Sequence, residues 1–144
     1  MENTLPLGVS TMKPGNNAAS IGPYSCGKII NAPEGMWGYS SGQVGRNPEY
    51  GALVSTSEAA GQAFQALTNL QNLAEANGFI LSKHTIKTTV FLTCMSDFAA
   101  INVEYSKFFN EPDSLPARSC VAVKELPMGA NFEIEAVFFK SHHS

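Results

Sequence analysis

The amino-acid sequence predicts an α+β fold in which a mixed sheet carries two helices on one face, with the elements in the order ββαβαββ. Three patterns lead to this prediction. Strand-like segments stand at both ends of the chain, two segments of helical period lie between them, and an alternating segment separates the two helices. With 144 residues, the chain is long enough to bury a core without disulfides or a structural metal. We therefore expect a single globular domain.

The beginning of the chain predicts a leader followed by a hairpin. Residues 1–20 are polar, hold two prolines and two glycines, and show neither a helical nor a strand period. We expect this leader to be flexible and the domain to occupy residues 21–144. Short segments rich in Ile, Tyr, Trp and Ser follow at 24–31 and 36–44, and the turn residues 32–35 separate them. This pattern is typical of two hairpin strands.

The first helix is predicted between residues 55 and 78. Ser55 and Glu58 have the spacing of a capping box, in which each side chain satisfies a free backbone N–H of the first turn. Gly78 supplies the helix stop. Between them, apolar residues recur at helical spacing: Ala60, Ala63, Phe64, Leu67, Leu70 and Ala74.

A strand and a second helix come next. Residues 84–93 alternate between apolar and polar side chains with the period of a strand. The helix is expected to begin at Ser96 as N-cap, with Asp97 in its first turn, and to end at Asn110 before Pro112. Its apolar stripe consists of Phe98, Ile101, Tyr105, Phe108 and Phe109.

The last two strands, 117–126 and 132–140, indicate a sheet that is apolar on both faces. Two helices cover only one face of a sheet of this size, yet apolar side chains of the last strand also point to the other face. We expect neighbouring copies of the chain to cover the helix-free face. Glu133 and Arg118 are expected on that face, partly buried at the junction between copies, where an unpaired charge is costly.

Composition narrows the class of protein. The chain is 44% hydrophobic and 15% charged, with no apolar run near the roughly 20 residues that span a membrane. It has no signal or transit peptide pattern, and its three cysteines form no CxxC pair, so we expect free thiols and a cytoplasmic location. A net charge of -3 offers no basic surface for a phosphate backbone, which disfavours nucleic acid as a partner.

Two apparent motifs carry no function. The segment from Gly22 to Ile29 fits GxxxxGK, but Ile29 stands where a P-loop needs Ser or Thr, and β-branched residues follow, so we interpret it as a turn entering a strand. The chain holds three histidines, His84, His142 and His143, and none has a partner at metal-ligand spacing. We expect no metal.

Cys120 and Asn102 each allow two interpretations. A nucleophilic Cys120 needs a base, and no histidine lies near it in sequence, so packing as a small hydrophobic residue is the alternative. Asn102 interrupts the apolar face of the second helix. It either satisfies a loop backbone or belongs to a site.

Five blocks stand in order between residues 20 and 140, the last of them in two parts. They are Ile21-Gly-Pro-Tyr24, Ser41-Gly-Gln43, Lys87-Thr-Thr-Val-Phe91, Asp97-Phe-Ala-Ala-Ile-Asn102, and Leu115-Pro-Ala-Arg-Ser-Cys-Val121 with Phe132-Glu-Ile-Glu-Ala136. Together they resemble the Rid family, the YjgF-like reactive-intermediate deaminases. The resemblance implies a chorismate-mutase-like α+β subunit that forms a homotrimer with three clefts at the subunit interfaces.

The same resemblance implies roles for individual residues. The carboxylate-binding arginine of the family falls on Arg118, and its water-positioning glutamate falls on Glu133. A guanidinium gives a carboxylate two parallel charge-assisted hydrogen bonds, and a partly buried carboxyl is suited to move a proton at an imine carbon. Further catalytic positions fall on Tyr24 and Asn102, and further binding positions on Ser41, Gly42 and Cys120. No cofactor is implied.

The expected activity is hydrolysis of 2-iminopropanoate, 2-iminobutanoate or a related imino or enamine acid to the 2-oxo acid and ammonia. One alternative is a non-catalytic trimer that binds a small carboxylate or a protein partner in the same clefts. Arg118 together with Glu133 favours the enzyme, because a carboxylate binder gains nothing evident from an acid beside its arginine. Ribonuclease activity, also attached to this family, is disfavoured by the acidic composition.

Overall fold

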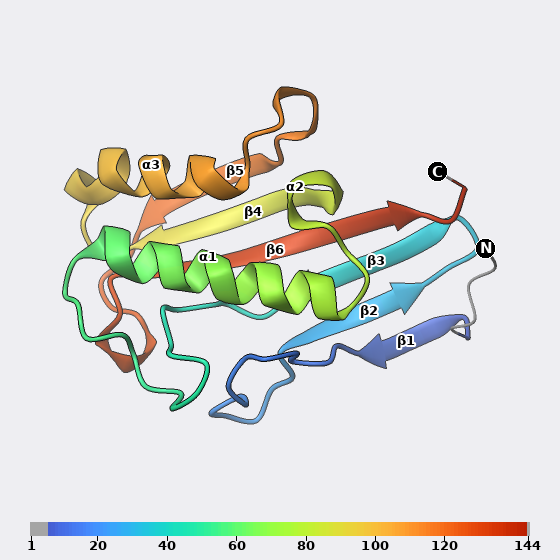
Figure 1. Ribbon diagram of the computed structural model, residues 1–144, viewed down its shortest axis with the longest axis horizontal. Helices are drawn as coiled ribbons and strands as arrows, with labels where there is room; N and C mark the ends of the chain where they lie inside the picture. The colour runs from blue at the N-terminus through green and yellow to red at the C-terminus, as the bar shows by residue number, and fades with distance from the viewer. Residues whose placement is uncertain (1–5, 144) are drawn as a thin grey trace.

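A computed structural model describes residues 6–143 of the chain. Its elements are β1 (Gly8–Thr11), β2 (Gly27–Asn31), β3 (Gly35–Ser40), α1 (Ala59–Ala76), α2 (Leu81–His84), β4 (Thr85–Leu92), α3 (Phe98–Phe108), β5 (Ala117–Ala122) and β6 (Phe132–Ser141). Within these residues, the strands form one six-stranded sheet in the spatial order β1-β2-β3-β6-β4-β5, and α1 and α3 pack together over one face of it (Figure 1). The pair β4 and β5 is parallel and the other pairs are antiparallel. The predicted α+β fold with a mixed sheet is confirmed.

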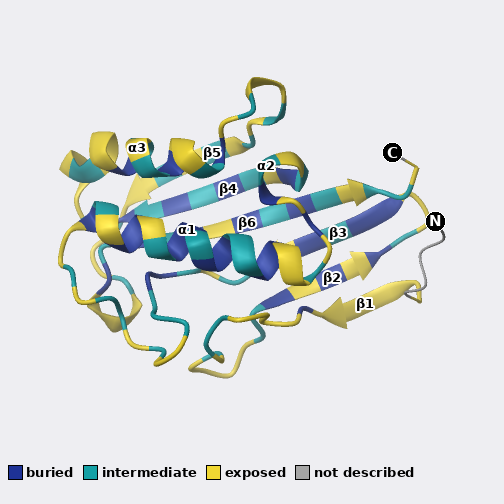
Figure 2. Ribbon diagram, viewed as in Figure 1, coloured by how far each residue is buried: buried dark blue, intermediate teal, exposed yellow. Residues whose placement is uncertain are grey.

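The hydrophobic core lies between the helices and the sheet, where Figure 2 shows the buried positions of α1, β4 and β6. Leu67 and Leu70 from α1, Ile101 from α3, and Phe132 and Phe138 from β6 are almost completely buried. Burying one such side chain stabilises the fold by about 1.5–3 kcal/mol, so this layer holds the helices on the sheet. Most residues of the apolar stripes predicted for both helices, and one face of β6, therefore form the core. Phe64 of α1 and Phe98 of α3 are exceptions, since they are 48% and 37% exposed.

The first strand corrects the prediction for the leader. Residues 8–11 pair with β2 as an edge strand, although residues 1–20 were expected to lack regular structure. Sequence periodicity does not reveal this strand, because all four of its residues are exposed and its pairing is made by the backbone. Met12 then enters the core, where it fills space left by two glycines. A Cβ atom at Gly38 would stand 2.7 Å from the Met12 Cε, and Gly27 is similarly close. Residues 1–5 lie outside the described part of the chain.

The helix starts also differ from the predicted ones. Glu58, not Ser55, precedes α1, and its backbone N–H donates to the Thr56 Oγ1 at 3.1 Å, so the expected capping box does not form. A 3₁₀ turn at Met95–Asp97 comes before α3, and the Ser96 hydroxyl contacts the Cys94 sulfur instead of capping the helix. None of the helices within residues 6–143 combines the length and the apolar character needed to cross a membrane.

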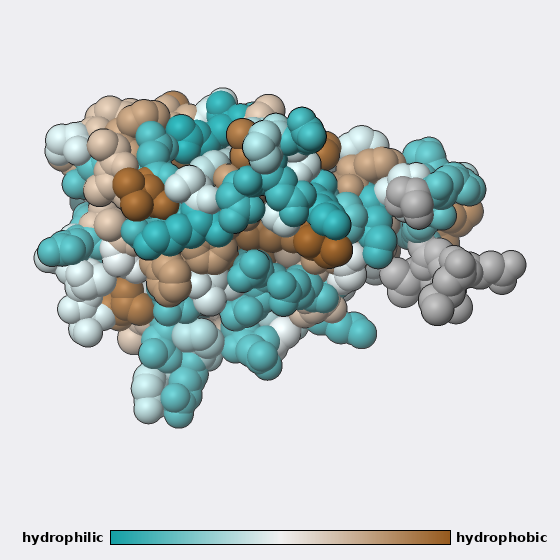
Figure 3. Space-filling view, turned by 45° about the horizontal axis from the view of Figure 1, so that its top comes forward, coloured by the Kyte–Doolittle hydropathy of each residue, from teal (hydrophilic) through white to brown (hydrophobic). Residues whose placement is uncertain are grey.

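The helix-free face of the sheet is apolar near its centre, as predicted. Trp37 and Phe139 lie on neighbouring strands with their ring centroids 4.6 Å apart, and Tyr39 pairs with Val137 beside them. Tyr39 is 44% exposed in the single subunit. On the side of the molecule seen in Figure 3, by contrast, hydrophobic residues appear as separate small groups between hydrophilic ones. A group of partly exposed apolar and aromatic side chains on a sheet face is suited to cover by another protein surface.

Candidate functional site

Arg118 lies on the helix-covered side of the sheet, which corrects the expectation that it shares the helix-free face with Glu133. Its β5 position pairs with Thr88 of β4, a fully buried residue, and Cys120 pairs with Val90, which is also fully buried. Glu133 pairs with Phe91 and therefore points to the opposite face. Alternation along a strand predicts which residues share a face, but it does not tell which face the helices cover.

The guanidinium of Arg118 is held by α3. Its Nη1 donates a hydrogen bond of 2.8 Å to the Asn102 Oδ1. Its central carbon lies 4.7 Å from the ring centroid of Tyr105 and 5.4 Å from that of Phe98. Among residues 6–143, no carboxylate lies within 4.0 Å of this guanidinium. A partly buried cation without an acidic partner is suited to bind an anion from outside the subunit.

The thiol of Cys120 lies on the same face of β5 and packs against the core. Burial raises its pKa, and the positive charge of Arg118 opposes this rise. A raised pKa keeps the thiol protonated at neutral pH, and the thiol is a much weaker nucleophile than the thiolate. The surroundings of Cys120 therefore favour a contact role over covalent catalysis.

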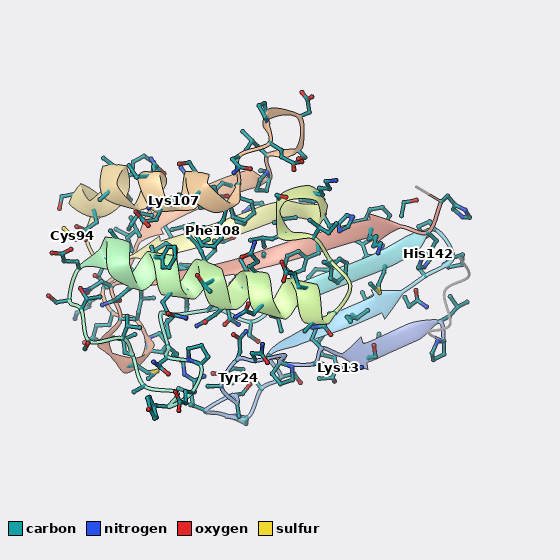
Figure 4. All side chains as sticks on the ribbon, in the orientation of Figure 1. Lys13, Tyr24, Cys94, Lys107, Phe108 and His142 are labelled. Atoms are coloured by element: carbon teal, nitrogen blue, oxygen red, sulfur yellow. The ribbon has the colours of Figure 1, made fainter. Side chains whose placement is uncertain are left out.

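A second group of predicted residues lines a cavity of about 60 Å³ on the other side of the sheet. Tyr24, Ser41, Gly42 and Glu133 contribute to its wall. The Ser41 hydroxyl donates to the Ser25 carbonyl at 2.6 Å, which ties the segment after β3 to the segment before β2. Figure 4 shows Tyr24 in the loop that leads into β2, toward the sheet edge opposite α3 and β5. These contacts bring residues of three separate segments to one place.

The carboxyl group of Glu133 is half-buried in this cavity. Desolvation raises its pKa above the ordinary value of 4.5, and the neighbouring negative charge of Glu135 raises it further. A carboxyl with a raised pKa is protonated in a larger fraction of molecules near neutral pH, and such a group exchanges protons with a reacting ligand more readily. Glu133 therefore has the electrostatic character of a general acid or base.

Gly42 gives the Glu133 carboxyl its room. A Cβ atom at position 42 would stand 2.7 Å from the carboxyl carbon of Glu133 and 2.8 Å from its Oε2. Because these atoms belong to the end of a flexible side chain, a larger residue at position 42 would displace the carboxyl and leave the backbone in place. Gly42 is therefore part of the site because its lack of a side chain leaves space for the Glu133 carboxyl.

We expect Gly42→Ala to lower catalytic turnover by about tenfold or more with little loss of stability, since a displacement near 1 Å is enough to disturb a catalytic group. Steady-state kinetics and thermal unfolding measured on the same preparation test this. Gly129→Ala is a control for the cost of replacing a glycine outside this cavity, because a Cβ there meets nothing within 4 Å and the only cost comes from its positive φ of 70°. Full turnover in Gly42→Ala would contradict the assignment.

The predicted site residues thus form two groups that one chain does not bring together. The first consists of the predicted residues Asn102, Arg118 and Cys120 together with the aromatic residues Phe98 and Tyr105 that contact Arg118, and is here called the Arg118 cluster. The second, here called the Glu133 cluster, consists of Tyr24, Ser41, Gly42 and Glu133. They point to opposite faces of the sheet. A single small ligand cannot contact both clusters of the same subunit.

Several neighbours of the two clusters were not predicted as site residues. Cys26, Pro127 and Met128 line the Glu133 cavity, and Met128 has a left-handed backbone with φ of 62°. No periodic signal marks these loop positions. Phe98 and Tyr105 had a signal: with Asn102 they recur at i, i+4 and i+7 on one face of α3. The amide that interrupts the apolar stripe marks the place where this face meets Arg118.

Metal ligands are not gathered in the described part of the chain. Among residues 6–143, no group of three or more His, Cys, Asp or Glu side chains is arranged to hold a metal ion. The Nδ1 of His84 accepts a hydrogen bond of 2.8 Å from the Ile80 backbone N–H, a local structural role.

The fold and the divided site define a class: an α+β chain whose described residues place a guanidinium without a carboxylate partner and a carboxyl of raised pKa on opposite sides of one sheet. Residues 15–139 match the family described as Endoribonuclease L-PSP. The chain belongs to this family, the YjgF-like Rid family.

Individual relatives are similar over most of their length. The chain is 48% identical over 118 residues to the RutC family protein y4sK of Sinorhizobium fredii, covering 82% of this chain and 87% of that protein. It is 40% identical over 123 residues to 2-iminobutanoate/2-iminopropanoate deaminase of Escherichia coli, covering 85% and 91%. Among solved structures, E. coli TdcF with bound serine matches with a TM-score of 0.79 at 33% identity, covering 92% of this chain and 99% of TdcF.

Proposed function

We propose that the protein is a cytoplasmic imine deaminase that hydrolyses small 2-imino or enamine acids, such as 2-iminopropanoate and 2-iminobutanoate, to 2-oxo acids and ammonia. The observation that carries this proposal is that the Arg118 guanidinium has no carboxylate partner among residues 6–143, while a Glu133 carboxyl of raised pKa lies on the opposite side of the sheet. In a homotrimer, the Arg118 cluster of one copy faces the Glu133 cluster of the next, and three complete clefts result.

The apolar helix-free face supports this assembly. Trp37, Tyr39 and Phe139 lie on the same side of the sheet as the Glu133 cluster, farther along β3 and β6, and they are only partly buried in one subunit. A contact that covers these rings removes apolar surface from water. It also excludes water from the cavity at Glu133, where electrostatic interactions then become stronger. Assembly and site formation are therefore one event.

The two clusters divide the chemistry between them. The Arg118 guanidinium forms two parallel hydrogen bonds with the substrate carboxylate and sets its orientation. Glu133 then takes a proton from a water molecule as the water oxygen bonds to the imine carbon. The same carboxyl returns this proton to the imine nitrogen, which gives a carbinolamine. It then takes the proton of the new hydroxyl group and passes it to nitrogen, so that the C–N bond breaks and ammonia leaves as the C=O bond forms. Water is the only co-reactant, and no cofactor takes part.

The names of relatives agree with this chemistry. A relative 40% identical in E. coli is a 2-iminobutanoate/2-iminopropanoate deaminase, and one of the same identity in Mus musculus carries the same name. The serine bound to TdcF carries a carboxylate, the group that we assign to Arg118. The imine substrates share this carboxylate and differ from serine at the reacting carbon.

Complementation between subunits tests the divided cleft. Arg118→Ala and Glu133→Gln are each expected to be inactive as pure trimers. Mixed trimers at a one-to-one ratio should recover about a quarter of the parental ammonia release, because half of the subunits supply a competent Arg118 and half of their neighbours a competent Glu133. Ammonia release from a freshly generated imine, corrected for spontaneous hydrolysis, measures this recovery.

The double variant Arg118→Ala with Glu133→Gln, mixed with either single variant, is the control and should recover nothing, since no cleft then holds both groups. No recovery in the mixture of single variants, with mixed trimers verified, would contradict a cleft shared between copies. Parental trimers that bind 2-oxobutanoate but release no ammonia would instead favour the non-catalytic carboxylate-binding module.

A further inference from the structure

We propose that Tyr105 is a positioning residue that sets the plane of the Arg118 guanidinium, so that its free N–H groups meet the substrate carboxylate in the correct orientation. The inference rests on the proposed function and adds to it a residue that does not touch the substrate. Three contacts of Tyr105 carry it: one to Arg118, one to Thr88 and one to Phe109.

Arg118 is oriented from one side by its hydrogen bond to Asn102, which uses one of five guanidinium N–H groups. A single hydrogen bond leaves the guanidinium free to rotate about it. The Tyr105 ring, with its centroid 4.7 Å from the guanidinium carbon, is close enough to remove this rotation. Phe98 lies farther away, at 5.4 Å, and is 37% exposed, so it constrains Arg118 less.

Two contacts hold the Tyr105 ring in place, one through its hydroxyl group and one through the ring itself. Its hydroxyl shares a hydrogen bond of 2.7 Å with the Thr88 hydroxyl, and its ring lies 4.6 Å from that of Phe109. Tyr105 is buried, and Thr88 is fully buried. Burial also raises the pKa of Tyr105, so the hydroxyl stays neutral and keeps this hydrogen bond at physiological pH. The ring is therefore a rigid surface for Arg118.

These contacts form a closed loop with the sheet. Thr88 of β4 is the register partner of Arg118 on β5. The backbone thus joins Thr88 to Arg118, the hydrogen bond joins Thr88 to Tyr105, and the ring contact joins Tyr105 back to Arg118. A change at Tyr105 consequently reaches Arg118 directly. A buried aromatic residue elsewhere in the core, such as Phe79, has no such connection.

Calorimetry with 2-oxobutanoate and steady-state kinetics on intact trimers test the proposal with two variants. Tyr105→Leu removes the ring, and we expect its Kd and KM to rise by about tenfold, the scale of one partly desolvated cation–π contact. Tyr105→Phe keeps the ring and loses only the hydroxyl bond to Thr88, so its Kd should stay within about threefold of the parent. If Tyr105→Leu does not fold, Tyr105→Met takes its place, because its longer and more flexible side chain adapts better to the space of the ring.

Two controls separate positioning from a merely structural role. Phe79→Leu makes a similar change in the same core, and it should lower the Tm while leaving the Kd unchanged. In an Arg118→Ala background, Tyr105→Leu should have no further effect on ligand binding, because a residue that acts through Arg118 has nothing left to position. Binding lost equally with and without Arg118, or a parental Kd in Tyr105→Leu, would overturn the proposal.

The readouts also distinguish this inference from the proposed function. Ligand affinity does not require turnover, so a parent that binds 2-oxobutanoate without releasing ammonia refutes the deaminase while the Tyr105 comparison still stands. An active parent with an unchanged Kd in Tyr105→Leu refutes the positioning role alone.

Discussion

Replacing Arg118 by alanine is expected to weaken 2-oxo acid binding by tens to thousands of times, since loss of one partner of a buried charge pair costs about 2–5 kcal/mol. The guanidinium is the one group of the Arg118 cluster that carries a positive charge, and within residues 6–143 no carboxylate neutralises it. The substrate carboxylate takes that place in the proposed cleft. Isothermal titration with 2-oxobutanoate measures the change.

Lysine at position 118 should not restore binding. An ammonium is a point charge without the planar fork, so it does not form two parallel hydrogen bonds with a carboxylate. It also lacks the flat surface that stacks on the Tyr105 ring at 4.7 Å. Lys restoring near-parental affinity would mean that charge alone suffices and that the bidentate geometry is wrong.

The alanine variant should remain folded, which makes the binding test interpretable. Arg118 forms no ion pair among the described residues, so its removal leaves no acid unpaired. Lys124→Ala, on the exposed segment after β5, removes the same charge away from both clusters and is the matched control. Parental affinity in Arg118→Ala, with the trimer intact, would show that the anchor is elsewhere.

Replacing Glu133 by glutamine is expected to lower turnover by roughly 10²-fold or more, the usual scale for loss of a general acid or base, while 2-oxo acid binding is retained. Glutamine keeps the size of the side chain and fits the space beside Gly42, but it cannot exchange a proton. The two substitutions therefore have opposite signatures: one removes binding, and the other removes turnover from a ligand that still binds. Ammonia release and calorimetry on the same purified preparations compare them.

Glu135→Gln is the matched control for this substitution. Glu135 is exposed and lies two residues along the same face, where its charge raises the pKa of Glu133. Its removal should keep the maximal turnover and move the acid side of the pH–rate profile to lower pH. Normal turnover in Glu133→Gln would remove the glutamate from the chemistry and favour the carboxylate-binding alternative.

The pH dependence of stability provides an independent check on Glu133. Because folding raises its pKa, the folded state binds more protons than the unfolded state between the ordinary pKa and the raised one. Stability contributed at this position therefore falls as pH rises through that interval. Glu133→Gln lacks this loss, so its Tm relative to the parent should increase over the same interval and then level off. A constant Tm difference would mean that the pKa is not raised.

The sequence by itself determined those helices and strands that bury one regular face, because the spacing of their apolar residues is visible within a single segment. The stripe of α1 with Leu67 and Leu70, and the alternation of β6 from Phe132 to Phe138, are read directly from spacing, because each element buries one regular face. Resemblance then identified the Glu133 cluster and three residues of the Arg118 cluster, but neither Phe98 nor Tyr105.

Only the tertiary structure decided how those residues are placed. The register of β4 and β5 places Arg118 under α3, on the face of the sheet opposite Glu133. Met12 packs into the core because Gly27 and Gly38 have no side chains to occupy that space. The pairing of Tyr105 with Arg118 depends in the same way on how α3 lies against the sheet. Alternation and helical period are properties of one segment. They show which residues share a face of that segment, but not what the face contacts. Which faces meet depends on packing between segments that are far apart in the chain, and no local pattern contains that information.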